Sequence, residues 1–270
     1  MRKALWANVK NNLVYYRRNR LLLVVGLLCV GVLLVSSFAS IFWTTANNRF
    51  ELARGLYTRV SMYTMLMVGL IGLIAVWSHR ANKSVKLIFT RPCSPRVWLA
   101  SHYVSAGLVF LLGMTIAVGS YLVSSLVWGI PIQTAVFASA LNHFIETFLV
   151  FSYLMLLSNW MHPVAAVLFF VFISENTFYY LALLCRAGSE ALPWKNAPPI
   201  LPGLETAFQG LYYLLPTMAP FETELQQLST SLRMPDNCAI HLLKGLVYLA
   251  LFIFFSFSLT VYNVRRQCMN

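Results

Sequence analysis

Hydrophobic residues in this chain form six long runs, separated by polar or charged segments. Each run reaches or exceeds the roughly 20 apolar residues that a helix needs to cross a ~30 Å hydrocarbon core. The runs lack the strict apolar–polar alternation of membrane-spanning strands, so they are predicted to be helices. The six predicted spans are Leu21–Trp43, Tyr57–Trp77, Trp98–Val127, Ile132–Leu157, Pro163–Leu184 and Leu242–Tyr262.

The overall composition agrees with a membrane protein. Hydrophobic residues make up 59% of the chain and charged residues only 10%, whereas about a quarter of a soluble domain is charged. The net charge of +12 comes from basic residues that flank the runs. They form no stripe interleaved with exposed aromatic residues, so binding to nucleic acid is not expected. The sequence therefore predicts an all-α polytopic membrane protein with one membrane domain, residues 21–270.

The basic residues also predict an orientation. Three segments are rich in Lys and Arg and contain no Asp or Glu: the residues before the first span, those between spans two and three, and those after span six. With six spans these segments share one side, and the positive-inside rule makes that side cytoplasmic. We therefore expect a multi-pass protein of a cell membrane, such as the bacterial inner membrane, with both termini in the cytoplasm.

Residues 1–20 carry a helical pattern ahead of the first span. Apolar residues recur at helical spacing, and basic residues supply a polar side: Leu5, Val9, Leu13 and Tyr16 against Lys10, Arg17 and Arg18. The pattern predicts an amphipathic helix in the inner membrane interface, held by apolar burial and by attraction to anionic lipids. A frayed basic tail is the alternative.

The cytoplasmic loop at residues 78–97 is the most informative polar segment. Its first part can form a short helix with Ile88 and Phe89 on one side and basic residues on the other. Pro92 and Pro95 end that helix, because the residue before a proline is pushed out of the αR region. The loop would suit the docking of a soluble partner, or it could serve only to fix the orientation.

This architecture resembles the type 2 permeases of ATP-binding cassette (ABC) exporters. The resemblance rests on the basic interfacial helix, the six spans, and a loop that ends in Arg91-Pro92-Cys93-Ser94-Pro95-Arg96. The apolar segment at residues 211–216, within the long outer loop at residues 185–240, is similar to the family's outer helices. In that loop, residues 204–215 predict an apolar helix and residues 221–232 predict a more polar one. Where the family usually has a lysine at the start of span three, this chain has Ser101-His102.

The resemblance implies a function, partners and contact residues. The chain would be the permease subunit of an exporter that moves a lipid, a lipid-linked glycan or a hydrophobic compound outward. It would pair with a second permease copy or a paralogue and with two cytoplasmic ABC ATPase subunits. The ATPase-coupling residues would be Lys83, Lys86, Ile88, Phe89, Arg91, Pro92, Pro95 and Arg96.

The chain carries no motif of its own for driving such transport. It has no Gly-x-x-x-x-Gly-Lys-Ser/Thr phosphate loop, and no lysine directly follows a glycine, so ATP and Mg²⁺ would bind to a partner subunit. The His-Glu-x-x-His and Gly-x-Ser-x-Gly motifs of common hydrolases are also absent from the sequence. We expect no enzyme activity and no cofactor in this chain, with membrane lipids as its further partners.

Two carboxylates fall near the middle of predicted spans. Glu146 follows Asn142 and His143 in span four, and Glu175 precedes Asn176 in span five. A charge at the bilayer centre costs about 2.5–3.5 kcal/mol on insertion scales, so these side chains should face the bundle or a wet cavity. They could form part of a translocation path or a proton-sensitive site. Alternatively they could make interhelical hydrogen bonds, with the acids either protonated or paired. A pair between His143 and Glu146 is one option.

No metal site is expected at this position, since two ligands without a third do not make one. Cys185 and Cys238 would both lie on the outer side, where a disulfide could form in an oxidising compartment; two unlinked thiols are the alternative.

Two other functions also fit the sequence. One is a scaffold or anchor subunit that transports nothing, and the other is an intramembrane enzyme that uses Glu146 and Glu175.

Overall fold

The computed structural model describes residues 2–20, 22–24, 26–31, 35, 49–81, 94–172, 175–191, 200–214, 228 and 232–269. This part of the chain is almost entirely helical and contains no strand. Its helices are α1 (Arg2–Arg18), α3 (Arg49–Ala81), α5 (Pro95–Trp128), α6 (Ala135–Ser158), α7 (Pro163–Phe172), α8 (Glu175–Ala191), α9 (Ile200–Leu214) and α11 (Cys238–Met269).

Five helical segments within the described residues are long and apolar enough to cross a membrane. They are Arg49–Trp77, Pro95–Trp128, Ala135–Ser158, Pro163–Gly188 and Cys238–Arg266, and they match predicted spans two to six. The prediction of an all-α polytopic membrane protein is confirmed. Predicted span one lies largely outside the described residues, where only a short apolar helix at Leu22–Gly31 is seen, so the count of six spans remains a prediction.

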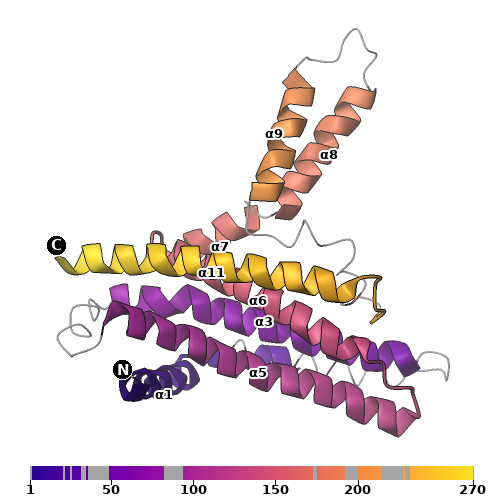
Figure 1. Cartoon of the computed structure of the whole chain (residues 1–270), viewed down its shortest axis with the longest axis horizontal. Coiled ribbons are helices and arrows are strands. Elements are labelled where there is room, and N and C mark those ends of the chain that lie inside the picture. The colour runs from indigo at the N-terminus through magenta and orange to yellow at the C-terminus, as the bar shows by residue number, and fades with distance from the viewer. Residues whose placement is uncertain are drawn as a thin grey trace.

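Four long helices run side by side and form the core of the bundle: α3, α5, α6 and α11 (Figure 1). Helix α3 packs against both α5 and α6, and α11 packs against α6. The interior is filled by fully buried side chains such as Tyr57, Tyr121 and Phe151, whereas Leu112, Leu126 and Phe254 are exposed. Apolar exposure on this scale marks a membrane-facing surface, because lipid rather than water then covers the side chains.

Helix α3 approaches its neighbours closely at two glycine contacts. A Cβ atom built on Gly72 would lie 2.7 Å from the backbone oxygen of Phe151 in α6. A Cβ atom built on Gly113 of α5 would overlap the side chain of Thr64 in α3. Small residues at such crossings let helix backbones approach within a membrane, where van der Waals packing supplies much of the association energy.

The remaining helices lie outside this core. Helix α1 packs on α5 and runs across the direction of the long helices near the end of the bundle that holds both termini (Figure 1). Helices α8 and α9 pair with each other, with the rings of Phe178 and Phe208 6.1 Å apart. Figure 1 shows this pair directed away from the bundle. Predicted span five therefore consists of two helices, α7 and α8, with different directions.

Two predictions about the outer loop have different outcomes. The apolar helix expected from Leu204 begins at Ile200, four residues earlier. Its first turn tolerates Pro202, because the first turn of a helix does not use that backbone N–H. The second helix, expected at residues 221–232, falls almost wholly outside the described residues.

Replacing Gly72 with alanine should destabilise the bundle by about 1–3 kcal/mol, the usual cost of overpacking a core. The added methyl group would meet backbone rather than a movable side chain, so α3 and α6 would have to separate. Thermal unfolding of the purified protein in detergent would measure the effect. Gly119→Ala is the matched control, since nothing lies within 4 Å of a Cβ atom built at that position. Equal melting temperatures for the two variants would contradict the role of Gly72.

Candidate functional site

The predicted coupling loop meets the bundle at the first turn of α5. Ser94 is the N-cap residue of this helix, and its hydroxyl accepts a hydrogen bond from the backbone N–H of Val97 at 3.3 Å. Pro95 occupies the first helical turn, where its missing N–H costs nothing. Pro95 and the exposed Arg96 thus belong to α5 itself rather than to a turn before it. The other coupling residues lie outside the described part: Lys83, Lys86, Ile88, Phe89, Arg91 and Pro92.

A buried polar contact fastens α1 to this same end of α5. The amide of Asn12 donates a hydrogen bond to the Ser101 hydroxyl at 3.0 Å, and that hydroxyl donates to the Trp98 carbonyl at 2.6 Å. The Tyr16 hydroxyl is hydrogen-bonded to Nδ1 of His102 at 2.7 Å. We call these five residues the α1–α5 junction.

The junction is almost fully enclosed. Tyr16 is 5% exposed and His102 1%, and the Trp98 ring meets the His102 ring edge-on at 4.9 Å between centroids. Burial raises the pKa of the Tyr16 hydroxyl well above its usual value, with a smaller contribution from Tyr15. The phenol therefore stays neutral and remains a stable hydrogen-bonding partner for His102.

The sequence predicted the helix at α1 but only part of what it buries. Val9 and Tyr16 are buried as expected, but Asn12 is buried beside them, and Lys10, Arg17 and Arg18 are exposed. The signal for Asn12 was its position one turn before Tyr16. In α5 the corresponding sign of a polar contact was the Ser101-His102 pair, which stands where the ABC permeases usually have a lysine.

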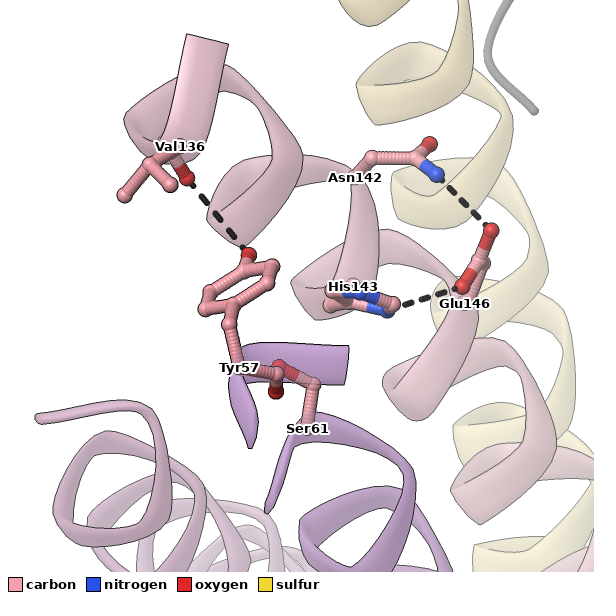
Figure 2. A network of polar contacts seen from close by, with 6 residues as sticks. All are labelled: Tyr57, Ser61, Val136, Asn142, His143 and Glu146. Carbon is pink, nitrogen blue, oxygen red and sulfur yellow. Dashed lines mark hydrogen bonds and ion pairs between the residues drawn. The ribbon is translucent and has the colours of Figure 1, made fainter. Parts of the chain in front are cut away.

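Helix α6 carries a second polar group, which we call the α6 polar cluster: Asn142, His143 and Glu146, with Tyr57 and Ser61 of α3 beside them (Figure 2). The Asn142 amide donates to Oε1 of Glu146 at 2.8 Å, and Nδ1 of His143 lies 3.2 Å from Oε2. Both contacts are made within one helix, over one turn. The i, i+3 spacing of His143 and Glu146 thus produces the contact that the sequence suggested. Within the described residues, both hydrogen bonds of the Glu146 carboxylate stay in α6.

Helix α3 supports the cluster from the opposite side. The Tyr57 ring lies 5.9 Å from the His143 ring, its hydroxyl donates to the Val136 carbonyl at 3.5 Å, and its own carbonyl accepts from Ser61 at 2.9 Å. Figure 2 shows Tyr57 on the α3 side and the Glu146 carboxylate on the side of α6 near α11. The His143 side chain is 10% exposed and that of Glu146 28%. The arrangement fixes the carboxylate in one orientation and leaves it partly accessible.

The structure places the second predicted acid on another helix. Glu175 is the first residue of α8 and Asn176 the second, and their side chains lie outside the described part of the structure. Only the group around Glu146 can therefore be described as a site.

Of the two alternatives for Cys185 and Cys238, the structure shows unlinked thiols rather than a disulfide. Cys185 and Cys238 are both free thiols. A disulfide needs its two Cα atoms within about 7 Å of each other. Cys185 lies in α8, which pairs with α9 and is directed away from the bundle, whereas Cys238 is the buried first residue of α11 (Figure 1).

Comparison with known proteins assigns no family to the chain: no family model matches it, and no curated protein matches it. Within the residues that the structure describes, no group of three or more His, Cys, Asp or Glu side chains is placed to hold a metal ion. The site must be interpreted from its own residues.

Tyr16→Phe should lower the free energy of unfolding by about 0.5–1.5 kcal/mol, the net contribution of one hydrogen bond. The ring would keep its packing, and only the hydroxyl that contacts His102 would be lost. Thermal unfolding in detergent provides the measurement. Tyr262→Phe removes the same hydroxyl from a side chain that is 61% exposed and should change little. An unchanged melting temperature for Tyr16→Phe would show that the Tyr16–His102 hydrogen bond contributes no net stability.

Asn142 and Glu146 should be energetically coupled by about 0.6 kcal/mol and by no more than roughly 1.7 kcal/mol, as for polar pairs measured in other membrane helices. The measurement is a double-mutant cycle of Asn142→Ala and Glu146→Ala. Pairing Asn142→Ala with Thr206→Ala in α9 gives the control, and those effects should add within about 0.5 kcal/mol. If the Asn142–Glu146 effects also add, the 2.8 Å contact does not stabilise the fold.

Proposed function

We propose that the chain is the transmembrane permease subunit of an ABC exporter, driven by separate ATPase subunits. The observation that carries this proposal is the start of α5 within the last residues of the predicted loop. The last residues of the loop are the first helical turn of α5, capped by Ser94, and the helix continues for 34 residues to Trp128. A displacement of Pro95 and Arg96 would therefore move α5 directly, since both residues belong to that helix.

The packing around α5 supports the transmission of such a movement. At its first turns α5 is fastened to α1 through the α1–α5 junction. Further along, Gly113 of α5 lies against the side chain of Thr64 in α3. A push on Arg96 would move α1, α3 and α5 together. In the proposed cycle, closure of the ATPase dimer moves this group and rocks the bundle against a second permease copy or a paralogue.

The remaining parts of the proposal follow from charge and composition. Both chain ends lie at the same end of the bundle (Figure 1), next to the start of α5. The positive-inside rule favours a cytoplasmic location for that end, and the membrane would be a bacterial inner membrane. ATP and Mg²⁺ would bind to the partner ATPases. The substrate class that suits the apolar helices is a lipid, a lipid-linked glycan or a hydrophobic compound.

Arg91→Glu combined with Arg96→Glu should reduce the co-purifying ATPase by roughly tenfold while the protein still inserts. Each exposed ion pair is worth about 0.2–1 kcal/mol, and charge reversal also adds repulsion. The experiment is affinity purification of the tagged full chain from native membranes, with mass spectrometry and ATP hydrolysis as readouts. Arg265→Glu with Arg266→Glu is the matched control. It makes the same charge change at the C-terminal end of α11, on the same predicted side.

Shape should matter as well as charge in this contact. Alanine at Ile88, Phe89 and Pro92 should weaken the association further. If all five substitutions together leave ATPase association and hydrolysis unchanged, the coupling role is wrong. A scaffold or anchor subunit would then be the better description.

A further inference from the structure

A groove lies where α1 meets α5, lined mainly by residues of α1. Its volume is about 300 Å³, at the lower end of the range for small-molecule sites. Residues of α1 line it at helical spacing, and Leu108 of α5 contributes to its wall. The lining residues from α1 include Trp6, Lys10, Leu13, Val14 and Arg17.

The lining divides into an apolar wall and a basic edge. Leu13, Val14 and Leu108 are apolar, and Trp6 is 52% exposed. Lys10 and Arg17 are exposed cations, two turns apart on one side of the helix. Helix α1 contains no acidic residue, so neither cation has a carboxylate partner on its own helix. A charged edge beside an apolar wall is complementary to a molecule that carries an anionic head and a hydrocarbon tail.

The position of the groove favours the same type of ligand. Helix α1 crosses α5 near one end of the bundle (Figure 1). For spans of this length, the ends of the helices lie at the level of the lipid headgroups. Beyond Leu108, α5 continues with Leu111 and Leu112, which are 60% and 66% exposed. An acyl chain could follow this apolar surface toward the middle of the membrane.

We propose that this groove binds one anionic phospholipid. Lys10 and Arg17 hold the phosphate, Trp6 lies at the headgroup level as interfacial tryptophans do, and an acyl chain packs against Leu13, Val14 and Leu108. Because α1 is fastened to α5 by Asn12 and Tyr16, the bound lipid would stabilise the position of α1 on the bundle. The proposal does not depend on whether the chain transports a substrate.

The test titrates phosphatidylglycerol into the purified full chain in detergent and follows both thermal stability and the lipid retained in native mass spectra. Phosphatidylglycerol should raise the melting temperature and be retained, and phosphatidylcholine should do neither. Lys10→Gln with Arg17→Gln should weaken the phosphatidylglycerol effect by roughly 30-fold, since each cation near a lipid surface contributes about a fivefold gain. Leu108→Trp, which fills the groove without changing charge, should abolish the effect, with the lipid-free melting temperature measured as the check on folding.

A matched control separates a defined site from general attraction. Arg18→Gln with Arg20→Gln removes the same charge from the same segment, at residues that do not line the groove, and should retain most of the response. Equal losses in the two double variants would overturn the proposal in favour of diffuse attraction. Equal stabilisation by soluble glycerophosphate would overturn it in favour of a free phosphate ester.

Discussion

The bundle depends on how closely α3 can approach its two neighbours. At Gly72 the α3 backbone meets the backbone of α6, and the side chain of Thr64 in α3 lies against Gly113 of α5. Neither contact has room for a larger residue on the glycine side. With α3 held at these crossings, the side chains of Tyr57, Tyr121 and Phe151 close the interior. The polar groups described above then lie where the packed helices exclude lipid.

The two polar sites use this packing in different ways. In the α1–α5 junction, hydrogen bonds join residues that are 89 and 86 positions apart in the chain, so they fix a helix outside the bundle to one inside it. In the α6 polar cluster, Asn142 and His143 satisfy Glu146 within one helix. The first arrangement determines where α1 lies on α5. The second supplies polar partners for the Glu146 carboxylate inside a membrane protein.

Much of the fold could be predicted from the sequence, because the length and hydropathy of a run largely decide whether it spans a membrane. Spans two, three, four and six each correspond to one helix, and span five to α7 and α8 together. The His143–Glu146 contact could be anticipated because it depends only on spacing along a helix. The partners of Asn12 and Tyr16 could not, because spacing along α1 contains no information about which part of α5 it meets. The sequence likewise left open whether Cys185 and Cys238 form a disulfide or stay free, because two cysteines near the ends of outer segments indicate a shared side, not a shared position.

The length of α5 has a consequence for the membrane around the protein. A helix of 34 residues is about 50 Å long at 1.5 Å per residue, whereas the hydrocarbon core is about 30 Å thick and the whole bilayer about 40–45 Å. The excess must be taken up by tilt, by protrusion or by local thickening of the bilayer. A thicker membrane would make α5 more upright and a thinner one would make it lean further, and α1 would move with it through the junction. Bilayer thickness therefore acts on this protein as a mechanical variable.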